Sequence, residues 1–189
     1  MKQYVEEVKK EFVSMCWCFA KVKEGESFDE LFDEAERRYY KLLERAMRDY
    51  ELKHWIKHDL SEGFEHIALK MIVAEALAKE LGAKSRSQVL DMLKSRRIEA
   101  EHEIETGKRR ADLYVGEKQL YVEVETFYGT RDPIADKLDY EGPSGELGTL
   151  RKYVGIKDAK VRVVIHSLHM LLYLKGLLML RRIYRNNYN

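Results

Sequence analysis

The chain has 189 residues, 45% of them hydrophobic, with 34 lysines and arginines against 33 aspartates and glutamates. This length and apolar content allow one core domain with an appendage and argue against low-complexity disorder. Because the charges balance, a basic global charge gives no sign of nucleic acid, and any such binding surface must be a local patch.

The only two cysteines, Cys16 and Cys18, are too few for a disulfide framework or a four-thiolate zinc site. They indicate thiols in a reducing compartment. Charged residues from Lys9 to Glu11 interrupt the first apolar stretch, so no signal peptide is evident and we expect a cytoplasmic protein. Few Asn and Gln among many charged residues favour a heat-adapted source such as an archaeon.

Two helices are expected before the core. Apolar residues at spacings of three and four predict the first helix over residues 2–22. Ser27 and Glu30 then form a capping box that opens a long second helix, which runs to about His58. We expect the two helices to pair as an antiparallel hairpin, which makes a domain of residues 1–59.

The second predicted domain, residues 60–189, begins with a helix that is apolar on almost every side. Ser61 is its expected cap and Gly82 its expected end. A helix of this kind is predicted to be packed on most sides. Glu65 and Glu62 lie in its first turns, where a carboxylate also suits the positive end of the helix dipole.

A short helix over residues 86–97 is predicted next, followed by a strand over residues 98–105. In that strand apolar residues and His102 alternate with glutamates, the period of a half-exposed strand. The pattern favours a solvated acidic face. Approach of Glu101 or Glu103 to a functional site is the alternative.

Residues 110–115 and 119–126 are rich in Val, Leu and Tyr, and the short turn between them predicts a β-hairpin. Because side chains alternate across a strand, Glu123 and Glu125 share one face. Asp112 in the partner strand is close enough to add a third oxygen donor. Three crowded carboxylates repel one another unless a cation lies among them.

After the hairpin comes a long loop over residues 126–143, and loops of this length are often functional. Its Arg131 and Lys137 are candidates for contact with phosphate. Residues 145–156 then predict a helix, and residues 160–166 predict a fourth strand.

The last predicted helix, over residues 168–185, is apolar but interrupted by charges. It falls short of the ~20 residues of a membrane span, so we expect a core helix or a homodimer helix instead. Arg181, Arg182 and Arg185, with two nearby tyrosines, make a basic and aromatic tail suited to a nucleic-acid backbone.

The hairpin resembles the PD-(D/E)XK, or restriction-endonuclease-like, superfamily, in which an Asp opens the second core strand and (D/E)-x-K lies on the third. Asp112 matches the first motif and Glu123-Val124-Glu125 the second, with Glu125 where most members have Lys. The resemblance implies an α/β fold: a restriction-endonuclease-like α-β-β-β-α-β core with a mixed central sheet, here with an N-terminal helical hairpin and a C-terminal helix. Lys152 lies where some members carry a relocated basic residue.

The same resemblance implies a metal-dependent nuclease that acts on nucleic acid, with DNA favoured over RNA. Mg²⁺ or Mn²⁺ would be held by Asp112, Glu123, the Val124 carbonyl and Glu65, with Glu62 as the alternative helix carboxylate.

Two kinds of side chain would assist that metal. Glu125 would hold or deprotonate the attacking water, the role Lys has in other members, with Lys152 as a further catalytic candidate. Arg109, Arg110 and Lys152 are the predicted phosphate clamps.

Two other classes of function remain open at this stage. The same fold could bind nucleic acid or a protein partner without cutting, and the Glu at the position of the usual Lys motivates that alternative. An assembly protein that uses its terminal helices is the third.

Overall fold

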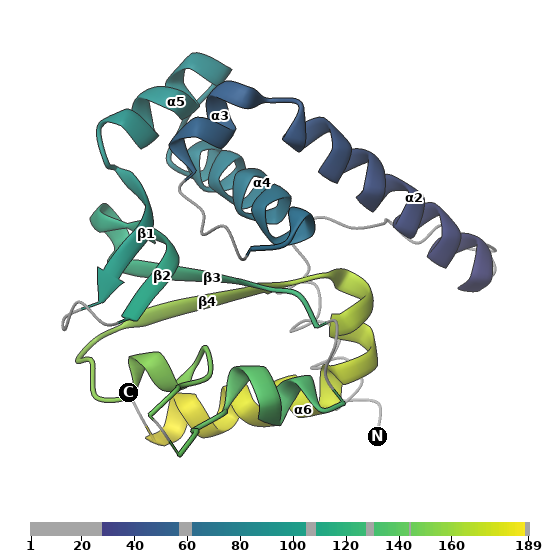
Figure 1. Cartoon of the computed structure of the whole chain (residues 1–189), viewed down its shortest axis with the longest axis vertical. Coiled ribbons are helices and arrows are strands. Elements are labelled where there is room, and N and C mark those ends of the chain that lie inside the picture. Colours follow the sequence, from purple (N-terminus) through teal and green to yellow (C-terminus); the bar gives the residue numbers. More distant parts are fainter. Residues whose placement is uncertain (1–27, 57–61, 105–108, 128–130, 144, 188–189) are drawn as a thin grey trace. The chain divides into compact units, whose positions relative to one another are not determined.

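The computed structural model of this chain divides into two units, Met1–Leu42 and Leu43–Asn189. The predicted domain boundary at residue 59 stays a prediction. The helix predicted over residues 2–22, with both cysteines, lies outside the described residues. The structure describes residues 28–56, 62–104, 109–127, 131–143 and 145–187 (Figure 1).

The helix predicted to run without interruption to about His58 is divided in two. Helix α2 spans Phe28–Met47 and α3 spans Tyr50–Trp55. Asp49 lies between them as the N-cap of α3, where its carboxylate accepts a 2.9 Å hydrogen bond from the backbone N–H of Leu52. The prediction of one helix was wrong because apolar spacing continues across a point where an Asp cap starts a new helix.

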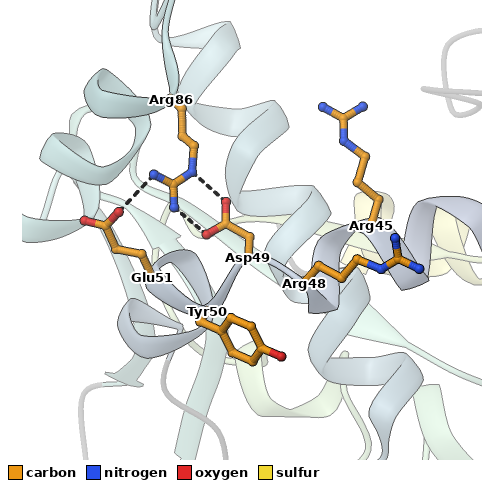
Figure 2. A pocket seen from close by; sticks show the side chains of 6 residues that line it. All are labelled: Arg45, Arg48, Asp49, Tyr50, Glu51 and Arg86. Carbon is orange, nitrogen blue, oxygen red and sulfur yellow. Dashed lines mark hydrogen bonds and ion pairs between the residues drawn. The ribbon is translucent and has the colours of Figure 1, made fainter.

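Asp49, the cap residue of α3, also forms an ion pair with α5, which spans Arg86–Lys94. The Arg86 guanidinium donates from Nε to Asp49 at 2.7 Å and from Nη1 to Glu51 at 2.9 Å (Figure 2). These residues line a shallow hollow of about 460 Å³ together with Arg45, Arg48 and Tyr50.

One mixed sheet forms the centre of the second unit, with strand order β1-β2-β3-β4. The first two pairings are antiparallel and the β3–β4 pairing is parallel. The mixed α/β class predicted from the sequence is therefore confirmed. The strands span Ile98–Ile104 (β1), Arg109–Val115 (β2), Leu120–Glu125 (β3) and Lys160–Ile165 (β4).

The predicted buried helix is α4, which spans Phe64–Glu80 and packs against β1, β2 and β3. Most of its apolar side chains are buried, as its unbroken apolar pattern predicts. Gly82 follows it with φ +95°, a backbone conformation that other residues adopt at a cost. Lys70 is the exception on this helix, because it is charged and yet 0% exposed.

The segment between β3 and β4 differs from the prediction of an α-helix over residues 145–156. Its described residues form two short helical turns, η2 (Ile134–Leu138) and η3 (Arg151–Tyr153), and an isolated antiparallel bridge between Glu141 and Leu147. The N–H of Gly148 donates a 2.7 Å bond to the Tyr140 carbonyl, and a Cβ on Gly148 would lie 2.5 Å from the Tyr140 nitrogen. The chain doubles back on itself here, and this close backbone contact replaces the predicted helix.

The C-terminal helix α6 spans Ser167–Asn187 and packs against η2. A Cβ on Gly176 would lie 3.2 Å from the Ile134 side chain, so glycine permits this close approach. Among the described residues, no helix is long and apolar enough to cross a membrane.

Candidate functional site

The ladder between β1 and β2 is interrupted at Asp112. Ala100 pairs with Leu113 and His102 with Ala111, whereas the intervening Glu101 and Asp112 drop out of the ladder. Glu101 has φ +53°, in the left-handed region that a side chain adopts at a cost. Glu101 and Asp112 therefore lie at a local departure from regular strand pairing.

The Asp112 side chain bonds to the backbone of β3. The β2–β3 ladder runs from the Leu113–Val122 pair to the Val115–Leu120 pair. Next to the end of this ladder, Asp112 Oδ2 accepts a 2.7 Å hydrogen bond from the Val124 N–H. The second carboxylate oxygen, Oδ1, is left to face α4. Asp112 is thus fixed by the backbone of one strand and available to side chains of a helix.

Glu62, His66 and Asp112 each offer one ligand atom, and these three atoms lie within 4.8 Å of one another. His66 Nε2 lies 3.2 Å from Asp112 Oδ1 and 3.9 Å from Glu62 Oε1. Glu62 lies two residues before the start of α4, and its carboxylate reaches back to His66 in the first turn of that helix. Among the described residues, this is the group whose donors converge enough to hold a metal ion.

Lys70 lies one further helical turn along the same side of α4. Its ammonium donates to both oxygens of Glu62, at 3.0 and 3.1 Å, and also to Glu101. Asp112 Oδ1 lies 3.8 Å from the same nitrogen. A fully buried ammonium is tolerated only when it is paired in this way.

The charges of this cluster support one another. Burial alone would raise the pKa of Asp112, but His66, the Val124 N–H and Lys70 hold it below its ordinary value. Burial alone would lower the pKa of His66, yet the hydrogen bond and charge of Asp112 raise it. The pKa of Lys70 is raised against burial in the same way, first by its bond to Glu101, so the ammonium stays charged.

The carboxylates of β3 face a different set of partners, on the segment before β4. Glu123 is 1% exposed, and its oxygens lie 3.2 and 3.3 Å from the Lys152 ammonium. The Tyr153 hydroxyl donates a 2.5 Å hydrogen bond to Glu123 Oε1. The Thr149 hydroxyl in turn donates to Glu125.

Burial dominates the proton affinity of these two carboxylates. It raises the pKa of Glu123 to about 7, because the opposing charge of Lys152 compensates only in part and the Asp112 charge adds to the shift. Burial likewise raises the pKa of Glu125, with the Thr149 bond opposing and the Asp112 charge adding. The Asp112 charge therefore adds to the shift at both β3 carboxylates.

The candidate ligands predicted from the sequence are divided between these two groups. Asp112 belongs to the α4 cluster, while Glu123 and Glu125 face Lys152 and its neighbours. Val124 contributes its N–H to Asp112.

The carboxylate that joins His66 and Asp112 is that of Glu62, the alternative candidate, which lies two residues before α4 begins. Glu65 lies on the first turn of α4, and its charge acts on His169 of α6.

The predicted phosphate-binding residues are similarly divided. Arg109 Nη1 donates a 2.9 Å bond to the Lys152 carbonyl, and Lys137 donates to the Thr126 carbonyl, so both have structural partners. Arg110 is exposed, with Glu103 3.9 Å away. Arg131, Arg181 and Arg182 are exposed as well. The side chain of Arg185 lies outside the described residues.

Sequence reasoning missed Lys70 and underrated Glu101, for which it favoured a solvated face. A signal for Lys70 was present, because it follows His66 by four residues, and residues four apart lie on one side of a helix. No comparable signal marked Glu101, since its direction depends on a local departure from strand geometry.

The resemblance to the PD-(D/E)XK superfamily depends on the Asp112 and Glu123-Val124-Glu125 pattern and on the order of the elements. The order helix, three strands and a final parallel strand is present, and the described residues between β3 and β4 form no α-helix. No protein-family model, curated protein or solved structure matches the chain.

Proposed function

We propose that this protein is a metal-dependent phosphodiesterase that cleaves nucleic acid, built on a restriction-endonuclease-like core. The observation that carries the proposal is the convergence of Glu62, His66 and Asp112 at the point where the β1–β2 ladder is interrupted. The distances from His66 Nε2 to Asp112 Oδ1 and to Glu62 Oε1, 3.2 and 3.9 Å, fit donors around one ion with bonds of about 2.0–2.2 Å.

The donor set indicates which ion is favoured. Two carboxylates suit Mg²⁺ and Mn²⁺, and an imidazole ligand shifts the preference toward Mn²⁺ because magnesium prefers oxygen donors. When bound, such an ion supplies charge stabilisation at a phosphoryl oxygen and lowers the pKa of a water molecule. Asp112, Glu62 and His66 would hold the ion, and Val124 fixes the orientation of Asp112 through its N–H.

The β3 carboxylates complete the proposed site. Glu125, which Thr149 holds by a hydrogen bond, is the candidate for orienting and deprotonating the attacking water. Lys152 and Tyr153 fix Glu123 beside it. Arg110 is exposed and lies two residues before Asp112, so it is a candidate for contact with the phosphate backbone. Arg181 and Arg182 are further candidates, on α6.

The proposal is tested by incubating the purified full chain with single- and double-stranded DNA and RNA in Mg²⁺ or Mn²⁺. We expect cleavage that a chelator abolishes, and faster cleavage in Mn²⁺. The substitutions His66→Ala and Glu125→Gln should each reduce the rate, the second by on the order of 10²–10⁴ with little change in affinity. The matched control is Glu75→Gln, an exposed carboxylate on the same helix. Absence of cleavage with every substrate and either metal would refute the proposal.

A nucleic-acid-binding or protein-binding module without catalysis is the second candidate. It is favoured by the occupation of both Glu123 oxygens by Lys152 and Tyr153. Binding that is unchanged by a chelator, without cleavage in any metal, would support this second function.

A further inference from the structure

The ammonium of Lys70 occupies a position that is costly to create. The side chain is 0% exposed, and its nitrogen lies within 3.1 Å of Glu62 and within 3.8 Å of Asp112. Glu101 also accepts a hydrogen bond from it. The carboxylates come from the segment just before α4, from β1 and from β2, so three separate parts of the chain direct negative charge to one buried cation. Such an arrangement requires the three parts to be placed together.

Two of those carboxylate oxygens face a second group as well. Asp112 Oδ1 lies 3.8 Å from the Lys70 nitrogen and 3.2 Å from His66 Nε2. Glu62 Oε1 lies 3.0 Å from the Lys70 nitrogen and 3.9 Å from His66 Nε2. Both oxygens therefore face the ammonium and the imidazole together, as bridging carboxylates face two cations in sites that hold two ions about 3.5–4 Å apart.

The charge of the cluster agrees with this geometry. Three ionised carboxylates carry a charge of −3 and the Lys70 ammonium contributes +1, which leaves −2 when His66 is neutral, as a metal ligand must be. One divalent ion balances that remainder, whereas two would leave an excess of positive charge in a largely buried site. A second ion would also have to displace an ammonium that already has three carboxylate partners.

We propose that Lys70 is a built-in second cation: its ammonium takes the place of a second metal ion beside Glu62 and Asp112, so that the site binds one divalent ion. Lys70 is on this view a positioning residue, which holds the two bridging carboxylates in place beside His66. The inference rests on the metal site of the proposed function, and it concerns how many ions that site takes.

The test is a Mn²⁺ titration of the full chain, followed by calorimetry and by electron paramagnetic resonance. We expect one Mn²⁺ per chain and the spectrum of an isolated ion. The variant Lys70→Met, which keeps the length of the side chain and removes its charge, should bind a second Mn²⁺ and show the spectrum of a spin-coupled pair. Lys79→Met removes an exposed ammonium from the same helix, where it pairs with Glu75 at 2.7 Å, and should still bind one.

Each outcome decides a separate question. Two ions in the unmodified chain, or one ion bound with unchanged affinity by Lys70→Met, would overturn the inference even if nucleic acid is cleaved. If Lys70→Met does not fold, the count in the unmodified chain still decides, since two ions there would refute the proposal. One ion per chain without any cleavage would support the inference and refute the nuclease. No Mn²⁺ binding at all would refute both.

Discussion

Tyr153 and Glu123 are joined by a 2.5 Å hydrogen bond in which the phenol donates to a carboxylate that is 1% exposed. The bond stabilises the charged carboxylate, so it lowers a pKa that burial raises to about 7. We expect Tyr153→Phe to move the pKa of Glu123 further up, by about one to two units, since a hydrogen bond to a charged group contributes about 1.5–3 kcal/mol.

Carbon-13 titration of the glutamate carboxyl groups measures this shift directly. The control is Tyr114→Phe, a half-buried tyrosine of the same sheet, whose ring stacks on His102 at a centroid distance of 4.1 Å. That substitution keeps the ring and should leave the Glu123 titration where it is. A Glu123 pKa that stays the same or falls in Tyr153→Phe would show that the bond contributes nothing to the charge state.

Asp112→Asn should weaken Mn²⁺ binding by at least on the order of 100-fold, the upper end of what the loss of an outer partner of a metal ligand costs. The amide has nearly the shape of the carboxylate and lacks its charge, so the fold should persist. Calorimetric titration measures the affinity, and circular dichroism checks the fold. Glu75→Gln, which removes an exposed carboxylate of α4, should bind Mn²⁺ as the parent does. Equal affinity in Asp112→Asn would place the metal elsewhere.

The stability of the second unit should fall in acid because of His166, which is 8% exposed. Burial, with a smaller contribution from the neighbouring His169, lowers the pKa of His166 from 6.5 to about 4. The unfolded chain therefore binds the proton first as pH falls. The contribution of His166 is complete above about pH 6.5 and is lost progressively toward pH 4, up to about 3 kcal/mol.

Urea unfolding between pH 7.5 and 4.5 measures that loss. His166→Gln should flatten the pH dependence, because glutamine does not titrate in this range. His54→Gln, at an exposed position on α3, should keep the dependence of the parent. A parent-like slope in His166→Gln would assign the acid sensitivity to other groups.

Asp49 has two roles that substitution can separate. Asp49→Ser keeps a cap for the Leu52 N–H and loses the ion pair with Arg86, whereas Asp49→Ala loses both. We expect the alanine variant to lose about 1 kcal/mol more unfolding free energy than the serine variant. Urea denaturation of the two variants gives the difference directly. If serine and alanine are equally destabilising, the cap does not stabilise α3.

Local patterns in the sequence predicted most of the regular elements. The β2–β3 hairpin follows from alternation of apolar residues around a short turn, and α4 from an unbroken apolar helix pattern. Errors occurred where a single residue changes the path of the chain. Asp49 starts a new helix within an apolar pattern that would otherwise continue, and Gly148 permits a backbone contact in place of a predicted helix.

The candidate site shows the same division between local and distant information. Spacing along one strand was enough to place Glu123 beside Glu125, and hairpin pairing brought Asp112 near them. The bond of Lys70 to Glu101 depends on how α4 lies on β1, and residue spacing along α4 does not show which carboxylate of the sheet reaches Lys70. Contacts between distant elements therefore determine which carboxylates share a partner.

Residue 101 has to meet two requirements that no single amino acid satisfies fully, a left-handed backbone and a carboxylate for Lys70. Glycine would adopt the left-handed backbone without the roughly 1–2 kcal/mol that a side chain costs there, but it would deprive Lys70 of a carboxylate. Glutamate supplies that carboxylate and retains the strain. A redesign that optimises the backbone of β1 alone would therefore replace Glu101 and disrupt the charge balance around Lys70, so this strand cannot be idealised independently of the helix above it.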